Sequence, residues 1–212
     1  RSSYDADKFI IIALYVDDTL ACETWSEEMN KFKAYLKKEF DTNMEESLTW
    51  FLSVHYQHNG DIMFLDQRAY IEKLLQEFSL EHAKETKTAM AEDFTLTAVD
   101  IPEAPCPDQV AMFRKLLGSL LFLAMWTRPD IAYPVTLLSR VATKPSEKTW
   151  AALKRVLRYL KGTKDTGVGY TWNGDKMHGF GRHEIFGYVD ASFGDCEITR
   201  RSTMGYVIML NG

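Results

Sequence analysis

Two short apolar runs lie near the start of the chain, separated by a pair of acidic residues. Residues 9–14 and 19–22 have the composition of strands, so the pattern predicts a β-hairpin whose tight turn holds Asp17 and Asp18. Two crowded carboxylates on a rigid hairpin repel each other unless a cation neutralises them. Carboxylate oxygens suit Mg²⁺, and two such ions can stabilise both oxygens of a phosphoryl transfer. A solvated hairpin tip is the simpler interpretation of these residues taken alone.

The next sixty residues change their period twice. Apolar residues spaced three or four apart predict an amphipathic helix over residues 26–40, with Ser26 as its N-cap. Residues 48–56 and 62–65 are typical of strands and flank an Asn-Gly turn, which predicts a second hairpin. Helical spacing returns from Gln67 to Phe78. The alternation is typical of an α+β fold with an antiparallel sheet.

The middle of the chain begins with a break in composition. Residues 84–108 carry three prolines, scattered acids and no sustained period, which predicts a linker or a long surface loop. Helical spacing follows, with Thr127 as a possible cap near the second helix, and indicates a helical bundle. The predicted helices are residues 111–126, 131–141 and 147–160, and the predicted later strands are residues 168–172, 185–191 and 203–210.

Positive charge is concentrated in the last predicted helix and its flanks. The whole chain of 212 residues has a net charge of −5, which argues against a uniformly basic coat but not against a local basic groove. Such a stripe is typical either of a solvated helix face or of a track for backbone phosphates, and both interpretations stay open. The cations between positions 144 and 164 are Lys144, Lys148, Lys154, Arg155, Arg158, Lys161 and Lys164, against Glu147 alone.

Several other classes of site find no support. The sequence contains no P-loop, dinucleotide fingerprint, nucleophile elbow or paired zinc motif. Three widely spaced cysteines predict reduced thiols and an intracellular protein. No apolar run approaches the length of a membrane span, and no signal peptide is evident, so no membrane partner is expected. His55 and His58 are predicted to lie at the surface, because their spacing on a strand directs them to opposite faces.

Asp190 follows an apolar strand and precedes a polar loop. A carboxylate in that position is a reasonable Mg²⁺ ligand, and a structural aspartate is the simpler interpretation of the local residues alone.

Several segments resemble, in the same order, the polymerase region of copia-type LTR retrotransposon Pol polyproteins. The resemblance covers nearly the whole chain. The matching segments are Leu14-Tyr15-Val16-Asp17-Asp18, Phe51-Leu52-Ser53-Val54, Leu65-Asp66-Gln67 with Tyr70-Ile71-Glu72-Lys73-Leu74-Leu75, Phe113-Arg114-Lys115-Leu116-Leu117-Gly118-Ser119-Leu120, Thr127-Arg128-Pro129-Asp130-Ile131, Leu157-Arg158-Tyr159-Leu160-Lys161-Gly162-Thr163, and Gly187-Tyr188-Val189-Asp190-Ala191-Ser192-Phe193 with Arg200-Arg201-Ser202-Thr203-Met204-Gly205-Tyr206.

The resemblance implies an organisation in four parts. Residues 1–82 would form the C-terminal part of a reverse-transcriptase palm, and residues 83–110 a linker or loop. Residues 111–165 would form a helical thumb or connection, and residues 166–212 the first strands of an RNase H domain. The intact parent would copy RNA into DNA, with a primer–template duplex and dNTPs as its partners and Mg²⁺ as its cofactor. It would act in a cytoplasmic virus-like particle or in the nucleus.

The same resemblance assigns roles to individual residues. Asp17 and Asp18 would hold Mg²⁺, with Tyr15 and Val16 near the primer terminus, and Asp190 would be the first metal ligand of RNase H. The helix that carries basic residues would lie along the duplex. Its predicted nucleic-acid-binding residues are Lys148, Lys154, Arg155, Arg158 and Lys161.

The chain also departs from the family pattern. Ser53 stands where the family usually has Gly, Asp66 where it usually has Ser, and Met204 where a small residue is usual. The family's first palm aspartate and its later RNase H acids have no counterpart here, so we expect a segment of a longer polypeptide that is inactive alone. A non-catalytic remnant that binds nucleic acid or protein, or a pseudogene product, is the alternative. The sequence indicates no oligomeric state.

Overall fold

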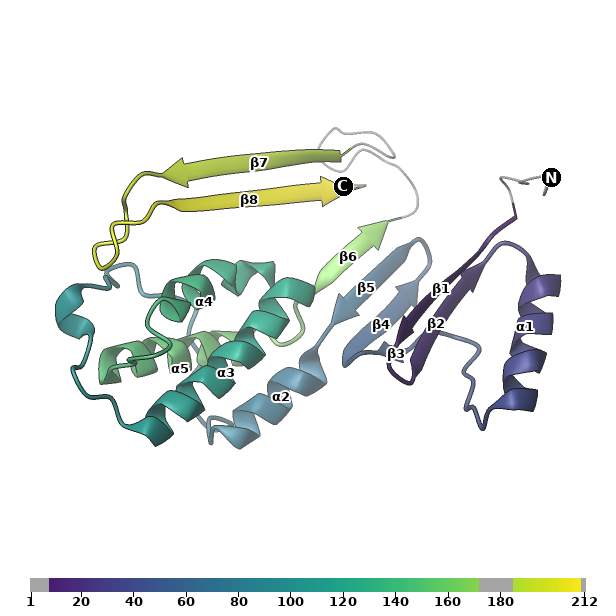
Figure 1. Cartoon of the computed structure of the whole chain (residues 1–212), viewed down its shortest axis with the longest axis horizontal. Coiled ribbons are helices and arrows are strands. Elements are labelled where there is room, and N and C mark those ends of the chain that lie inside the picture. Colours follow the sequence, from purple (N-terminus) through teal and green to yellow (C-terminus); the bar gives the residue numbers. More distant parts are fainter. Residues whose placement is uncertain (1–7, 172–184, 211–212) are drawn as a thin grey trace. The chain divides into compact units, whose positions relative to one another are not determined.

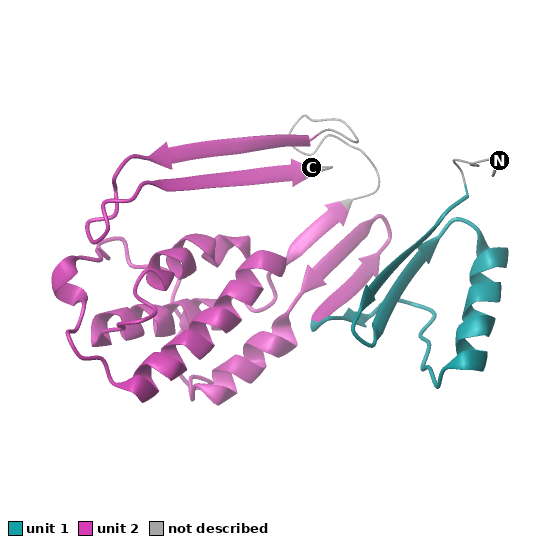
Figure 2. Ribbon diagram, in the orientation of Figure 1, with its two compact units in different colours: residues 1–53 teal, residues 54–212 magenta. Residues whose placement is uncertain are grey.

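The computed structural model describes residues 8–171 and 185–210 of the chain (Figure 1). The chain divides into two compact units, residues 1–53 and residues 54–212 (Figure 2). This division precedes the predicted palm boundary near residue 82, which stays a prediction. The predicted end of a strand at Trp172 lies outside the described residues.

The first unit contains the predicted hairpin. Strands β1 (Ile10–Tyr15) and β2 (Asp18–Glu23) pair antiparallel, with Tyr15 opposite Asp18. Most of the hairpin's side chains are exposed. At the open end of the hairpin, the Thr24 N–H donates to the Phe9 carbonyl at 3.0 Å.

Helix α1 (Ser26–Glu39) follows the hairpin, and the short strand β3 (Trp50–Phe51) ends the unit. The helix is confirmed, but its predicted N-cap is wrong. Ser26 is already helical and Trp25 precedes it without a side-chain cap hydrogen bond. Acids in the first turn and lysines in the last turn complement the helix dipole instead.

The second unit begins with an antiparallel sheet. Strands β4 (Val54–Asn59), β5 (Ile62–Asp66) and β6 (Val168–Thr171) lie side by side in that order. The predicted strand over residues 48–56 is interrupted, because Leu52 and Ser53 both have positive φ. Strand β6 was grouped with the later strands by sequence, whereas the structure pairs it with β5.

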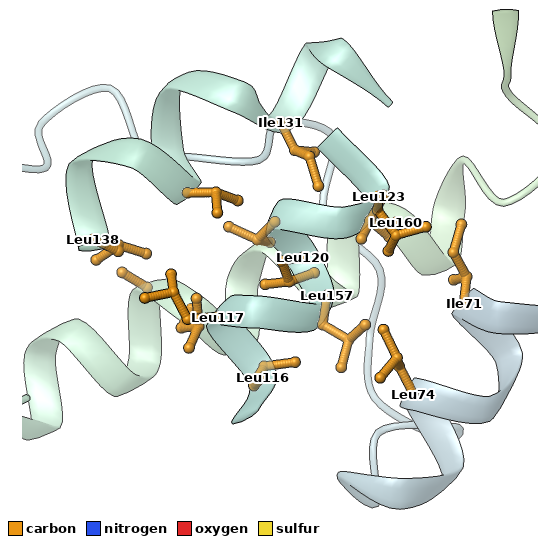
Figure 3. Packing of buried hydrophobic residues seen from close by; sticks show 14 of the residues in the cluster. Ile71, Leu74, Leu116, Leu117, Leu120, Leu123, Ile131, Leu138, Leu157 and Leu160 are labelled. Atoms are coloured by element: carbon orange, nitrogen blue, oxygen red, sulfur yellow. The ribbon is translucent and has the colours of Figure 1, made fainter. Parts of the chain in front are cut away.

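Four helices supply the core of the second unit. Their buried aliphatic side chains converge on one cluster (Figure 3), which the amphipathic spacing of the sequence indicated. Each helix buries one apolar stripe, and Phe113 meets Trp150 edge to face at 5.5 Å between ring centroids. The helices are α2 (Arg68–Glu77), α3 (Pro107–Trp126), α4 (Ala132–Ser139) and α5 (Glu147–Gly162), with 3₁₀ turns at Ala98–Asp100 and Pro129–Ile131.

Helix α3 is long and apolar enough to cross a membrane by length and composition, contrary to the sequence expectation that no run approaches this length. Five of its residues belong to the buried cluster, as expected for the central helix of a folded core. It begins earlier than predicted, because Pro107 suits the first turn of a helix. Thr127 ends α3 and does not cap the next helix.

The last described element is a long hairpin. Strands β7 (Ile185–Ser192) and β8 (Thr203–Leu210) pair antiparallel in register, with Asp190 opposite Gly205. Apolar side chains such as Tyr188 and Ile208 are exposed on it. The loop end of this hairpin contacts the residue that follows α4, because Arg140 donates to the Thr203 hydroxyl at 2.6 Å.

Candidate metal and nucleic-acid sites

The first candidate site is the tip of the β1–β2 hairpin. Strand β1 ends at Tyr15 and β2 begins at Asp18, so only Val16 and Asp17 form the turn. Asp18 is therefore the first residue of a strand and not a turn residue as predicted. Val16 has φ of 54°, a left-handed conformation that is costly for a β-branched residue. The pairing of both strands holds the turn in this strained conformation.

Both aspartates of this tip are exposed, and so is Tyr15. Carboxylate oxygens have the right chemistry for Mg²⁺, so the residues present fit part of a magnesium site. Within residues 8–171 and 185–210, no group of three carboxylate, histidine or cysteine side chains is placed to hold a metal. At this tip the described residues bring together two carboxylates, those of Asp17 and Asp18, which could supply two of the oxygen ligands of such an ion.

Asp190 occupies the middle of β7 and does not end a strand, contrary to the sequence prediction. It is exposed. The nearby acid Asp195 has a structural role, because it accepts the Thr203 hydroxyl at 2.6 Å. Among the described residues, Asp190 belongs to no group of three histidine, cysteine or carboxylate side chains that could hold a metal.

The thiol of Cys196 lies in the same loop, between β7 and β8, and is buried. A hydrogen bond from Thr199 lowers the pKa of Cys196 from 9.0 to about 7, and Arg140 acts in the same direction. The sequence assigned this cysteine no role.

Helix α5 carries the second candidate site. Ser146 caps it: the Thr149 N–H donates to the Ser146 hydroxyl at 3.3 Å, and the Ser146 N–H donates back to the Thr149 hydroxyl at 2.8 Å. The helix buries Leu153, Val156 and Leu157, among others, so its basic side chains lie on the remaining faces. This two-faced arrangement is the one that the sequence predicted.

The basic side chains of α5 contact a segment that the sequence predicts to be a linker or a long surface loop. Lys161 donates to the Ala83 carbonyl at 2.9 Å, and Arg158 donates to the Lys84 carbonyl at 2.5 Å. Arg155 donates to a hydroxyl of the same segment at 2.9 Å. The segment is therefore docked along the helix.

The two remaining predicted contacts on this helix differ from these three. Lys148 forms an ion pair with Asp100 at 2.9 Å, and Asp100 is only partly exposed. Lys154 is exposed and lies over the Trp150 ring, 5.5 Å from its centroid. Apart from Trp150, which lies four residues before Lys154, these partners could not be predicted from the sequence. Each of them lies 48 or more residues from its cation along the chain.

Asp66 was noted in the sequence only as a departure from the family, and His55 was predicted to lie at the surface. Asp66 is buried and accepts the Arg68 N–H at 3.0 Å, so it satisfies one free donor at the start of α2. His55 Nδ1 lies 3.0 Å from the other carboxylate oxygen, and its side chain is 32% exposed, so His55 is partly buried at the surface. An Asp two residues before a helical period was the signal for this cap.

Comparison with known proteins places the chain among retrotransposon sequences. Residues 2–92 match the family "Reverse transcriptase (RNA-dependent DNA polymerase)". The chain is 30% identical over 99% of its length to the retrovirus-related Pol polyprotein from transposon TNT 1-94 of Nicotiana tabacum. It is 32% identical over its whole length to the putative transposon Ty5-1 protein of Saccharomyces cerevisiae. A secreted RxLR effector protein of Plasmopara viticola is 43% identical over 45% of the chain.

The chain spans only part of these relatives, namely 16% of the tobacco polyprotein, 65% of the yeast protein and 63% of the effector. No solved structure matches it. The order of the family-like segments, the Asp17–Asp18 hairpin and the similarity to these relatives all indicate the same family. The chain therefore belongs to the copia-type retrotransposon Pol polyproteins and includes part of their reverse transcriptase region.

Proposed function

We propose that this chain supplies the catalytic hairpin and part of the duplex-binding surface of an RNA-directed DNA polymerase. The observation that carries the proposal is the tip of the β1–β2 hairpin, which holds two adjacent exposed carboxylates, Asp17 in the turn and Asp18 as the first residue of β2. Exposed acids on a rigid turn are accessible to a cation and a nucleic-acid terminus together. The reaction is attack of a primer 3′-hydroxyl on the α-phosphorus of a dNTP, with release of pyrophosphate.

Asp17 and Asp18 would hold Mg²⁺ in this reaction, and Tyr15 and Val16 would contact the primer terminus. The ions, when bound, make the primer hydroxyl more acidic and neutralise charge on the leaving phosphate. The role of the chain itself is positional. The strand pairing of Tyr15 with Asp18 fixes where the carboxylates stand, so little reorganisation is needed during reaction.

The isolated chain is proposed to be inactive in primer extension. The family resemblance implies a three-carboxylate site, and the described residues bring two acids to the hairpin tip. Removing a metal ligand from such a site costs orders of magnitude in rate, since the charge that develops on the phosphate loses its counter-charge.

The β7–β8 hairpin is proposed to be the start of an RNase H domain in the parent. Its support is the resemblance of the residues around Asp190 and the exposed apolar side chains of the hairpin. A two-stranded ribbon is marginal by itself, so further strands from the parent would cover its edges and faces. Asp190 would then become one of several acids in that site.

The test uses the parent reverse transcriptase, including the residues upstream of this chain. Primer extension on poly(rA)–oligo(dT) with Mg²⁺ is measured for Asp17→Asn, Asp18→Asn and the control Asp41→Asn, which changes an exposed acid of the same unit. Each of the first two variants is expected to lose about 10³-fold or more in rate, whereas the control keeps full activity. Extension by both variants at the parental rate would refute the proposal.

A non-catalytic role in binding nucleic acid or protein is the second candidate. The observation that favours it is the similarity to a secreted RxLR effector protein, because that relative is named for a role other than polymerisation. The coding sequence distinguishes the two. A contiguous reading frame with the upstream aspartate strand, protease and integrase supports the polymerase, whereas interruption by stop codons or a host exon supports the remnant.

A further inference from the structure

Residues 83–101, called the strap below, run antiparallel to helix α5. The contacts proceed along the chain in reverse order: the beginning of the strap meets the end of the helix. Along this path the strap touches four of the five basic residues predicted to bind nucleic acid. The contacts are Ala83 with Lys161, Lys84 with Arg158, Thr88 with Arg155 and Asp100 with Lys148.

The strap is part of the folded core and not a free linker. Leu96 is buried, and Met90 and Phe94 pack against the central apolar cluster. Its end is fixed by a capping box, in which the Thr97 N–H donates to Asp100 at 2.8 Å. The positions of its oxygens next to α5 are therefore set by packing.

The strap contacts the cations of α5 with two kinds of group, neutral acceptors and one carboxylate. Arg155, Arg158 and Lys161 are held by one hydroxyl and two backbone carbonyls, which are neutral acceptors. Among the described residues, no acid forms an ion pair with any of these three, so their charges are not neutralised within the fold. Glu85 lies at the C-terminal end of the helix beside Gly162 without forming such a pair.

Lys148 is the exception at the other end of the strap. Its ammonium group contacts both carboxylate oxygens of Asp100, at 2.9 and 3.1 Å, and it also lies over the Phe94 ring. An ion pair of this kind leaves little net field for an external anion. The same segment thus orders three positive charges and cancels a fourth.

We propose that the strap is part of the phosphate-binding surface. It orders Arg155, Arg158 and Lys161 for contact with the sugar–phosphate backbone of a nucleic-acid duplex. Asp100, by its ion pair, prevents Lys148 from binding phosphate. This inference rests on the proposed function and specifies which cations act. An ordered side chain loses less conformational entropy on binding than a mobile one. Neutral acceptors achieve this order without reducing the attraction to phosphate.

The first test measures binding without catalysis. The full chain is titrated into a fluorescein-labelled RNA–DNA duplex of about 20 base pairs, a length sufficient for several phosphate contacts. Fluorescence anisotropy is recorded at several NaCl concentrations, without Mg²⁺ and dNTPs. Omitting both separates this test from primer extension, so the phosphate-binding inference can fail while the dependence of the polymerase on Asp17 and Asp18 stands.

Two triple variants with the same charge change are compared in this assay. Replacing Arg155, Arg158 and Lys161 by Gln is expected to reduce the salt slope by about 2.7, since each phosphate contact contributes about 0.9. Replacing Lys33, Lys37 and Lys38 of α1, which are exposed, by Gln is the control and should leave the slope nearly unchanged. Equal salt slopes for the two triple variants, or no binding of the duplex by the unsubstituted chain, would overturn the inference.

A gain of affinity tests the role of Asp100. Asp100→Asn frees Lys148, so the duplex should bind more tightly and the salt slope should rise by about 0.9. Asp93→Asn is the matched control, because Asp93 is an exposed acid of the strap with the same charge change. If the two variants raise the affinity for the duplex equally, the gain comes from net charge alone, and the ion pair with Asp100 does not prevent Lys148 from binding phosphate.

The acceptor at Thr88 decides whether the strap orders the cations or shields them. Thr88→Val keeps the shape but removes the oxygen that Arg155 contacts, and we expect affinity to fall about two- to threefold. Thr86→Val is the control, since Thr86 donates to the Arg155 carbonyl and not to the guanidinium. Tighter binding by Thr88→Val would show that the strap competes with phosphate. Thermal melts of both variants confirm that they fold.

Discussion

Arg128 donates to the backbone carbonyl of Thr163 at 2.9 Å and to its hydroxyl at 2.6 Å, across 35 residues of sequence. Its side chain is fully buried, and its guanidinium also forms a two-point contact with Asp130. Tyr159 donates to the same carboxylate at 2.8 Å. The two segments that resemble the family at residues 127–131 and 157–163 thus form one polar cluster, which joins the end of α3 to the end of α5.

Removing this arginine should destabilise the second unit strongly. Arg128→Ala leaves the Thr163 carbonyl without its guanidinium donor and removes the two-point contact to Asp130, which keeps only the Tyr159 hydroxyl among these side-chain donors. We expect the free energy of unfolding to fall by about 3 kcal/mol. Arg114→Ala, which removes an exposed arginine with one hydrogen bond to the Ala142 carbonyl, should cost less than about 1 kcal/mol. Urea unfolding monitored by circular dichroism provides the comparison. A cost for Arg128→Ala no larger than for the control would contradict this structural role.

Asp130 should make stability depend on acid pH. Burial raises the pKa of this carboxyl, but hydrogen bonds from Arg128 and Tyr159 outweigh burial and hold the pKa below its ordinary value of 3.8. A lowered pKa in the folded state contributes stability above the unfolded pKa, and this contribution is lost as pH falls through the folded value. The free energy of unfolding should therefore decline below about pH 4, and less steeply in Asp130→Asn. Parallel slopes for the two proteins would refute the assignment.

Gly167 should not tolerate even one added methyl group. A Cβ at this position would clash with the Leu65 carbonyl oxygen, because the chain passes close to β5 just before β6 begins. Gly167→Ala must therefore displace a strand, with an expected cost of about 3 kcal/mol. Gly169→Ala is the matched control inside β6, where an added Cβ meets nothing within 4 Å and little change is expected. Equal melting temperatures for the two variants would contradict the close approach.

Ser53 departs from the family glycine at a position where the backbone favours glycine. Its φ is 63°, in the left-handed region that costs a residue with a Cβ about 1 kcal/mol. Ser53→Gly should therefore raise the free energy of unfolding by up to about 1 kcal/mol, less the greater entropy of glycine in the unfolded chain. Ser53→Ala keeps the Cβ and should bring no gain, which separates backbone strain from loss of the hydroxyl. Calorimetric melts of the three proteins measure the difference.

Local patterns were sufficient for much of the fold and for part of the site. The hairpin around Asp17 and Asp18 was predictable because strand composition and turn chemistry act within a few residues. The apolar stripe of α5 was predictable because helical period alone determines which side chains can share a face. The strain at Val16 was not predictable, since the turn conformation depends on the register that both strands adopt together.

The sequence alone determined the type and order of most helices and strands and the concentration of positive charge on α5, because these depend on neighbouring residues. Only the tertiary structure decided that residues 83–101 lie against that charge, that β6 pairs with β5 and that Arg128 reaches Thr163. These contacts join positions from 35 to about 100 residues apart. They form where apolar faces pack against each other. A segment in which apolar residues have no regular spacing carries no local signal that indicates its partner.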